Sequence, residues 1–344
     1  MSIAAVQRPV RRELAQVQEL LREAFRTSIP ILNKVGGHVL ATRGKKLRPT
    51  LLLLTARARG RLDQAAILSA AAIEMVHAAA LIHDDSVDRS VLRRGLPTVN
   101  GLWTDEMAII MGDYLFAHAV GLLVRHRLEC TLEVLSRVAT DMACGEALEF
   151  QYAYDLDVTE ERYLELARAK TGSLMGAATE IGSGGEAGRA RAPGAGVAPR
   201  RGARVLFREF GERLGVAFQI VDDLFDYLGD PEVMGKPVGS DLAEGKVTLP
   251  LIAALREASE SDRRRLKQLA LRKRWTAGQW QGLRRLIEKC GGFEYARARS
   301  HALAQESRCL LERALGPITA RPAPAIAAAR ALDRAVDYAV RRDR

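Results

Sequence analysis

The run ILSAAAIEMVHAAALIHDDSVD at residues 67–88 joins a long apolar segment to the aspartate cluster Asp84-Asp85-Ser86-Val87-Asp88. Its length, its alanine content and its lack of strand-like alternation predict a buried helix. A second cluster of the same D-D-x-x-D form, Asp222-Asp223-Leu224-Phe225-Asp226, lies in another apolar, helix-patterned segment, GVAFQIVDDLFDYLGD at 215–230. In each cluster the first and last aspartates are four residues apart, so on a helix they share one face.

The two clusters predict a magnesium site. Carboxylates about 6 Å apart repel each other and are costly on a half-buried surface unless cations neutralise them. Hard carboxylate oxygens suit Mg²⁺, which commonly binds through one or two carboxylates together with substrate phosphates. A single D-D-x-x-D is more often solvated surface charge. Two of them, each in an apolar helix and each followed by basic residues, favour two or three magnesium ions around a diphosphate.

Basic and polar side chains accompany both clusters. Lys45 and Arg48 lie where a helix is expected to begin, and free backbone N–H groups at such a position favour anions. The other candidates are Arg93 and Arg94 after the first cluster, Lys170 and Thr171 within a helix, Gln219 one turn before the second cluster, and Lys236 and Lys246 in the loop after it. This number of cations fits recognition of a diphosphate. His77, two turns before Asp84 on the same face, is either a ligand-binding residue or a core histidine.

Composition indicates an all-α fold in a single domain spanning residues 1–344. The chain is 48% apolar, alanine, leucine, arginine and glutamate are abundant, and there is no internal repeat. Further helices are expected to start near Arg11 and to cover 104–119, 127–153, 160–181 and 210–227. Residues 182–204 are rich in glycine, alanine, arginine and proline, which predicts a flexible surface loop.

Charge and cysteine usage bound the partners and the compartment. A net charge of +10 fits nucleic acid, anionic lipid or phosphate-bearing substrates. The densest basic run, 262–274, lacks interleaved aromatic residues and is typical of a solvated helix face, so no nucleic-acid partner is expected. Four separated cysteines and an N-terminus without an apolar leader predict a reduced, cytoplasmic protein. The apolar stretch 65–82 contains Glu74 and His77, which favours a core helix over a membrane span.

Five ordered motifs make the chain similar to the trans-isoprenyl diphosphate synthases, and most of all to bacterial octaprenyl diphosphate synthases. They are GKKLRP at 44–49, LIHDDSVDRSVLRRGLPTVN at 81–100, KTGSL at 170–174, GVAFQIVDDLFDYLGD at 215–230 and VGSDLAEGKVTLPLI at 238–252, and the closing AVRRDR adds to them. The match extends over about residues 30–252. The resemblance implies a large antiparallel helix bundle around a deep central apolar cavity, usually in a homodimer.

The resemblance also implies a role for each candidate residue. Isopentenyl diphosphate would be bound by Lys45, Arg48, His77 and Arg94. The principal Mg²⁺ ligands would be Asp84, Asp88 and Asp222, supported by Asp85, Asp223 and Asp226 directly or through water. The allylic diphosphate, farnesyl or geranyl, would be held by Arg93, Lys170, Thr171, Gln219, Lys236 and Lys246. Lys170, Arg93 and the six aspartates would form the catalytic set.

Product length is expected to be long, about C40, giving an all-trans polyprenyl diphosphate that supplies quinone side chains such as that of ubiquinone and is destined for a membrane. Ala79 and Ala80 are the fifth and fourth residues before Asp84, where a bulky aromatic residue stops elongation early in the family that the chain resembles. The alanines would also suit close helix packing. Two alternatives stay open: a short-chain geranylgeranyl or farnesyl diphosphate synthase, and a noncatalytic subunit of a heteromeric synthase.

Two features depart from the resemblance. Ser240 stands where related enzymes often carry another aspartate before Asp241, which is expected to remove an outer contact at the metal site. The segment 182–204 is longer than usual by roughly a dozen residues.

Overall fold

The computed structural model describes residues 2–42, 44–184, 201–229, 239–317 and 321–341, and helices dominate it. The longer helices are α2 (Arg11–Ala24), α3 (Pro30–Ala41), α4 (Leu47–Ala58), α5 (Gln64–Val87), α7 (Asp105–Arg125), α8 (Glu129–Gln151), α10 (Ser173–Gly184), α11 (Arg201–Leu228), α15 (Glu260–Ala270), α16 (Ala277–Lys289), α17 (Gly292–Leu315) and α18 (Ala323–Arg341). Shorter helical segments are α1 (Ile3–Gln7), η1 (Arg8–Val10), α6 (Val99–Leu102), α9 (Glu160–Ala167), η2 (Arg168–Gly172), α13 (Ser240–Ala243) and α14 (Leu249–Glu257).

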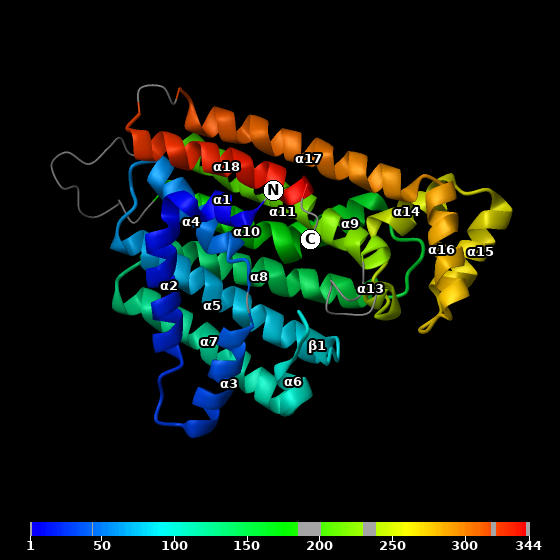
Figure 1. The fold of residues 1–344 in the computed structure, drawn as a ribbon, viewed down its shortest axis with the longest axis horizontal. Coiled ribbons are helices and arrows are strands. Elements are labelled where there is room, and N and C mark those ends of the chain that lie inside the picture. The colour runs from blue at the N-terminus through cyan, green and yellow to red at the C-terminus, as the bar shows by residue number, and fades with distance from the viewer. Residues whose placement is uncertain (1, 43, 185–200, 230–238, 318–320, 342–344) are drawn as a thin grey trace.

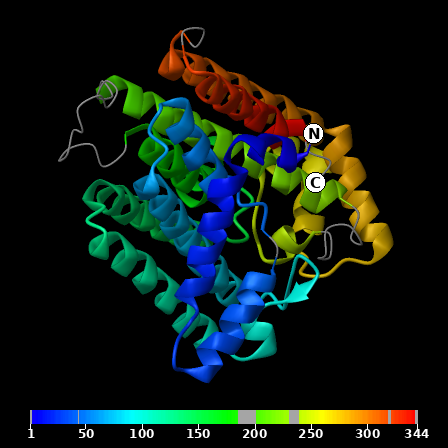
Figure 2. The same ribbon diagram turned by 60° about the vertical axis from the view of Figure 1, so that its left-hand side comes forward.

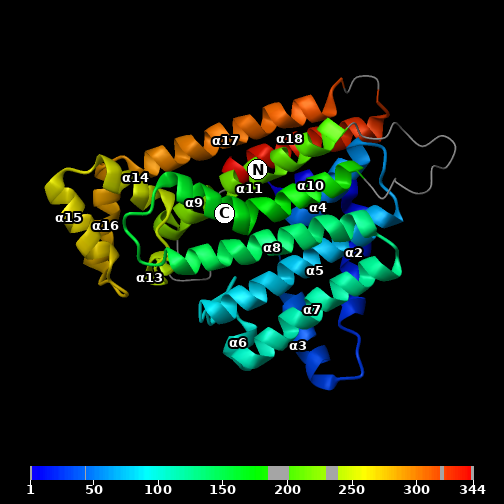
Figure 3. The same cartoon turned by 180° about the vertical axis from the view of Figure 1, so that it is seen from behind.

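The long helices form an antiparallel bundle, as expected from the resemblance (Figure 1). α11 packs against both α10 and α17, α5 packs against α7, and α4 lies between α10 and α18. Seen from behind, α5, α7 and α8 form one side of the bundle, and α17 and α18 lie along the other (Figure 3). α2 and α3 cross the side formed by α5 and α7, and α14, α15 and α16 gather at one end (Figure 2).

The apolar residues of α5 lie around the helix rather than forming one stripe, as expected of a largely buried helix. Asp63 caps its N-terminus by accepting a hydrogen bond from the backbone N–H of Ala66. By length and composition, α5 and α7 could each cross a membrane, with 61% and 39% of their most apolar windows buried inside the bundle. A core helix passes the same test, and the burial of α5 agrees with the expected core helix.

Several predicted boundaries are corrected by the structure. A helix, α1, precedes the expected start near Arg11, and residues 92–97 form a short antiparallel hairpin of β1 (Leu92–Arg93) and β2 (Leu96–Pro97). The loop predicted at 182–204 is wrong at both ends, because α10 continues to Gly184 and α11 begins at Arg201. Gly182 lies within α10 and packs closely on α4: a Cβ added at Gly182 would be 2.4 Å from the Leu52 carbonyl oxygen. Its lack of a side chain therefore serves helix packing and does not end the helix. Residues 185–200 lie outside the described residues.

Candidate active site

Both aspartate clusters open onto one cavity of about 1790 Å³, larger than the roughly 300–1,000 Å³ of ordinary ligand pockets. α5 lines it from Glu74 to Asp88, which at 1.5 Å per residue is a depth of roughly 20 Å. The clusters occupy the C-terminal turns of α5 and α11, and these two ends lie at the same end of the bundle. The cavity therefore has an acidic mouth and a long wall that runs toward α2, whose Leu21 and Phe25 also line it.

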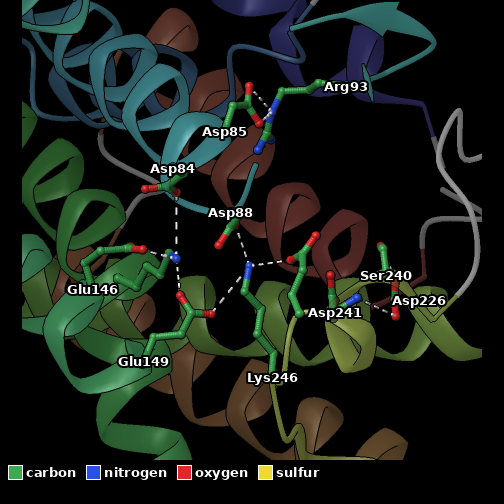
Figure 4. Close-up of polar contacts among 12 residues, drawn as sticks. Asp84, Asp85, Asp88, Arg93, Glu146, Glu149, Asp226, Ser240, Asp241 and Lys246 are labelled. Carbon is green, nitrogen blue, oxygen red and sulfur yellow. Dashed lines mark hydrogen bonds and ion pairs between the residues drawn. The ribbon is translucent and has the colours of Figure 1, made fainter. Parts of the chain in front are cut away.

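Two lysines lie among the carboxylates of the mouth. Lys246 Nζ is 2.7 Å from Asp88 Oδ2 and 2.9 Å from Glu244 Oε2. Figure 4 shows Lys246 reaching toward Asp88 from the opposite wall of the mouth. Lys170 is the second lysine, and its Nζ is 3.8 Å from Asp84 Oδ2. Two ammonium groups thus contact the first aspartate cluster, and the expected role of Lys170 and Lys246 in binding the allylic diphosphate stays a prediction.

Three glutamates of the mouth were missed by the sequence analysis. Glu146 Oε2 is 2.8 Å from Lys170 Nζ, and Glu149 contacts Lys170 and lies 3.8 Å from Lys246. Glu244 is the third. Glu146 and Glu149 are three residues apart and share a face of α8, and this spacing in a helix that faces the aspartates is the signal that could have found them.

The charge of the mouth shifts the titration of these groups. Burial, which the charge of Lys170 opposes, raises the pKa of the Asp84 carboxyl. Burial would lower the pKa of Lys170, but Asp84, Glu149 and Glu146 raise it above its ordinary value. Five carboxylates (Asp84, Asp88, Glu146, Glu149 and Glu244) outnumber the two lysines at the mouth. The mouth therefore carries an excess of negative charge, and this charge lies on carboxylate oxygens.

Two of the six cluster aspartates, Asp85 and Asp223, hold the structure of the mouth together. The single N–H of Arg93 Nε is shared between the two oxygens of the Asp85 carboxylate, at 2.7 and 2.9 Å. Asp223 accepts hydrogen bonds from Tyr163 Oη at 2.5 Å and from Gln219 Nε2 at 2.8 Å. Burial, followed by the charge of nearby Asp241, raises the pKa of Asp223 to about 8. These two aspartates are buried, whereas Asp84 and Asp222 line the cavity with more of their surface exposed.

Ser240 contacts the second aspartate cluster. Its hydroxyl donates a hydrogen bond to Asp226 Oδ1 at 2.9 Å, and the backbone N–H of Asp241 donates to Asp226 Oδ2 at 3.3 Å. The loss of an outer contact to the metal, expected from the serine, stays a prediction. An aspartate here would place a second carboxylate against the buried Asp226, whereas a hydroxyl can donate to it.

Thr171 and Gln219 meet at a helix irregularity. Thr171 belongs to η2, a π-helical turn between α9 and α10, and such turns are frequent at functional sites. Its hydroxyl donates to Gln219 Oε1 at 2.7 Å, while the Gln219 amide donates to Asp223. Both residues line the cavity, as does Lys170 in the same turn. Lys236, the remaining residue predicted for this region, lies outside the described residues.

Arg48 and His77 meet inside the cavity wall. Arg48 Nη1 lies 2.8 Å from His77 Nε2, and because a guanidinium can only donate, the neutral histidine accepts at Nε2 and carries its proton on Nδ1. Burial, and then the charges of Arg48, Arg94 and Arg93, hold the pKa of His77 well below its usual value. Burial also lowers the pKa of Arg48 to about 10. Arg48 Nε is buried without an acceptor among the described residues, so a donor remains for an anion.

Glu74 lies among the cations of this wall and was not predicted. Burial lowers the pKa of Arg48, of Arg94 and of Lys46, and the charge of Glu74 opposes this effect. Gly44 gives these groups room, because an added Cβ there would be 3.0 Å from Arg94 Nη1 and 3.9 Å from Glu74 Oε1. Lys45 lines the same cavity with its ammonium 5.6 Å from the ring centre of Tyr338.

Ala79 and Ala80 both line the cavity. Ala79 is 3% exposed and belongs to an apolar cluster with Phe25 and Leu115, while Ala80 is less buried. Ala79 packs against other helices, which fits the helix-packing interpretation. Ala80 borders the cavity, which fits the chain-length interpretation.

The donor set fits magnesium that arrives with a phosphate. Among the described residues, no three His, Cys, Asp or Glu side chains are arranged to hold an ion by themselves. The carboxylates that would bind it, Asp84 on α5, Asp88 at the C-cap of α5 and Asp222 on α11, all line the same cavity. Mg²⁺ usually keeps waters and takes one or two carboxylates plus substrate phosphates, so an incomplete protein shell suits it.

The chain belongs to the polyprenyl synthetase family, whose model matches residues 29–284. It is 39% identical over 262 residues to the short chain isoprenyl diphosphate synthase of Methanothermobacter thermautotrophicus, covering 75% of this chain and 77% of that protein. It is 31% identical over 319 residues to the octaprenyl diphosphate synthase of Escherichia coli, covering 91% and 93%. The polyprenyl synthase of Caulobacter crescentus CB15, solved with calcium and isoprenyl diphosphate, superposes with a TM-score of 0.87 at 31% identity, covering 100% of this chain and 98% of that one.

These similarities confirm the family expected from the motifs, and the protein is a prenyltransferase. They also confirm the isoprenoid synthase type of helix bundle. Relatives of both short and long product length match this chain over most of its length. The family alone therefore leaves product length to be argued from the cavity.

Proposed function

We propose that this protein condenses an allylic diphosphate, farnesyl or geranyl, with successive isopentenyl diphosphates to a long all-trans polyprenyl diphosphate of about C40, for quinone side chains. The observation that carries this proposal is the cavity of about 1790 Å³, which has carboxylates and cations at its mouth and an apolar wall behind them. The mouth suits two diphosphates, and the depth suits a chain that lengthens inside the protein.

Two or three Mg²⁺ ions would be held by Asp84, Asp88 and Asp222. Bound there, magnesium would neutralise the charge that develops on the departing allylic diphosphate. Lys170 and Lys246 are positioned to share that task, because each already contacts the carboxylates of the first cluster. Arg93, Thr171, Gln219 and Lys236 complete the proposed allylic diphosphate site.

The isopentenyl diphosphate would be bound by Lys45, Arg48, His77 and Arg94. The neutral His77 holds Arg48 from one side and leaves the guanidinium charge on Arg48, which is the charge that a diphosphate needs. The double bond of this substrate then faces the allylic carbon. Holding two reactants in such a position can contribute about 7–11 kcal/mol to lowering the barrier.

The bond changes follow from this placement. Loss of diphosphate from the allylic carbon leaves a delocalised cation, and the isopentenyl double bond attacks it to form the new carbon–carbon bond. A proton is then lost, and the released diphosphate is its acceptor, since the polar side chains nearest the reacting carbons are already engaged with one another. The apolar wall excludes water that would otherwise quench the cation.

A short-chain geranylgeranyl or farnesyl diphosphate synthase is the second candidate, because a short-chain relative matches this chain at 39% identity. The space beside Ala80 favours the long product. A noncatalytic subunit of a heteromeric synthase is the third candidate. Both aspartate clusters and the lysines that contact the first of them are in place, and this favours a catalytic subunit.

We further propose a homodimer that pairs through α7. Ile109, Ile110, Phe116 and Val124 are exposed on one side of that helix, at 51%, 51%, 40% and 58% of their surface. Four large apolar residues gathered on one helix face mark an interaction surface. Sedimentation of the wild type and of an Ile110→Asp variant tests this pairing, since the variant should sediment at half the mass, and an unchanged mass would contradict it.

The direct test is to incubate the purified protein with farnesyl diphosphate, labelled isopentenyl diphosphate and Mg²⁺, and to size the products. We expect a main product near C40 and no elongation when EDTA replaces Mg²⁺. A main product of C15 or C20 would favour the short-chain alternative. A folded protein that incorporates no label alone but does so with a partner chain would favour the subunit alternative.

A further inference from the structure

A second cavity, of about 500 Å³, lies at the far end of α4 from the active site. α4 and α18 pack side by side and run in opposite directions. At one end of this pair Lys45 lies beside Tyr338, and at the other end Arg59 lies beside Arg321. The twelve residues of α4 place the two ends roughly 18 Å apart. The second cavity is therefore separate from the site already described.

The lining of this cavity is basic. Arg57, Arg59 and Arg321 line it, and Glu13 is the only acidic residue that does so among the described residues. Glu13 is already occupied, because its Oε1 accepts a hydrogen bond from Arg57 Nη2 at 2.6 Å. Arg321 donates to the carbonyl oxygens of Ala58 and Leu315, which fixes its guanidinium without neutralising the charge.

Arg59 is the residue that most lacks a counter-charge. Its Nε is buried and has no hydrogen-bond acceptor among the described residues, and the same is true of Arg57 Nε. Burial, followed by the charges of Arg321 and Arg61, lowers the pKa of Arg59. Two like charges beside a half-buried guanidinium are unfavourable unless an anion joins them.

We propose that this cavity, which we name the arginine pocket, binds a phosphate group. The guanidinium fork of arginine matches phosphate oxygens in pairs. Arg59 lines the opening beside Arg321, whose Nη1 and Nη2 each carry a second N–H besides the one that donates to a carbonyl oxygen. The bound group is either a free phosphate or diphosphate or the phosphate of a lipid headgroup, which share this chemistry. The proposal does not rest on the proposed product or on the activity of the cavity between α5 and α11.

The test begins with the unmodified protein in EDTA at constant ionic strength. Amide hydrogen exchange is measured with inorganic diphosphate, with phosphatidylglycerol vesicles and with phosphatidylcholine vesicles. Slower exchange over residues 57–62 and 321–326 is expected with diphosphate or with phosphatidylglycerol, and not with phosphatidylcholine. The arm that protects these residues identifies the source of the phosphate. Protection in neither arm, or protection confined to residues 44–48, would overturn the proposal.

Variants then locate the site. Arg59→Gln removes the charge from a side chain that makes no hydrogen bond to the residues the structure describes, so its unfolding midpoint in phosphate-free buffer should equal or exceed that of the wild type. Its affinity for the protecting probe should fall at least tenfold, the size expected for one charge-assisted contact. Arg59→Lys keeps the charge and should lose less. Arg272→Gln, an exposed arginine on another face, is the matched control. Affinities within twofold of wild type for Arg59→Gln would contradict a phosphate site here.

Discussion

At the mouth of the active site, individual carboxylates are paired with two lysines. Glu149 contacts Lys170 and approaches Lys246, while Asp84 and Asp88 contact the same two lysines. An arriving diphosphate would compete with these carboxylates for the lysines, and magnesium would compete with the lysines for the carboxylates. The acidic residues thus keep two flexible cations in position before substrate binds, at the cost of mutual repulsion that the substrate and its metal would relieve.

Replacing Asp84 or Asp222 with alanine should abolish condensation, which we take as a fall in kcat of more than about a hundredfold. Stability should change little. Burial disfavours the charged form of Asp84, so its removal relieves an unfavourable charge and the Asp84→Ala protein should melt at or above the wild-type temperature.

The measurements are label incorporation at saturating Mg²⁺ and the unfolding midpoint. Asp262→Ala, far from the mouth on α15, is the control for loss of a carboxylate. Near-normal turnover by either cluster variant would refute the assignment of these aspartates to the metal.

His77 should make stability depend on pH. Because the pKa of His77 is held well below 6.5 in the folded protein, the unfolded chain binds a proton below that pH which the folded protein does not. Stability should therefore fall as the pH decreases below about 6.5, by up to about 1.4 kcal/mol per pH unit from this residue. Arg48, Arg94 and Arg93 are the charges that face it.

Urea unfolding of the wild type and of His77→Gln between pH 5 and 8 isolates this contribution as a difference. Glutamine can still accept the hydrogen bond from Arg48 but cannot take up a proton. Parallel pH profiles for the two proteins would show that His77 has the same pKa in the folded protein as in the unfolded chain, and would contradict this prediction.

At the scale of helices, a seam of glycines brings α10 and η2 onto α11. A Cβ added at Gly215 would be 2.7 Å from the Gly172 Cα, and one added at Gly211 would be 2.4 Å from the Met175 carbonyl oxygen. These approaches bring Thr171 within hydrogen-bond distance of Gln219. The backbone contact between two helices thus sets the geometry of the proposed allylic site.

Gly215→Ala should therefore reduce both stability and activity. The added methyl forces η2 and α11 apart, which costs about 1–3 kcal/mol in overpacking, and it moves Thr171 away from Gln219. Gly37→Ala in α3 is the matched control, since nothing lies within 4 Å of its added Cβ. That variant should gain roughly 0.5–1 kcal/mol from helix propensity. Denaturant unfolding and kcat of both proteins check this, and a Gly215→Ala enzyme with wild-type kcat would disprove the positional role of the seam.

How far the sequence could predict these elements depends on what each signal measures. The D-D-x-x-D clusters and the apolar run of α5 were sufficient to predict the helices that carry the clusters and the aspartates that line the mouth. Gly182 was predicted as a loop residue, because propensity cannot distinguish a glycine that breaks a helix from one that lets two helices touch. Glu74, Glu146 and Glu149 look like ordinary helix residues until packing places them beside cations.

At the scale of the whole molecule, the walls of the main cavity come from segments far apart in the chain. Leu21 and Phe25 on α2, Phe116 on α7, Met142 on α8 and Phe218 on α11 all line it. No local pattern could bring these residues together, so the depth of the cavity had to be inferred from Ala79 and Ala80 alone. The structure shows that the wall continues beyond these alanines toward α2, which is consistent with a long product.

Product length should respond to Ala80→Phe. Ala80 borders the cavity one turn from Asp84, so a phenylalanine ring there would fill the proposed path of the growing tail while leaving the mouth unchanged. The first condensations should survive and later ones should stop, moving the main product from about C40 to C15–C20. Total incorporation of label should fall less than the length of the product.

Ala79→Phe is the informative comparison. Because Ala79 is 3% exposed and belongs to an apolar cluster with Phe25 and Leu115, a phenylalanine ring there should lower stability by about 1–3 kcal/mol. Product sizing and melting temperature for both variants separate blockage from misfolding. A well-folded Ala80→Phe enzyme that still makes the full-length product would place the limit on chain length elsewhere along the wall.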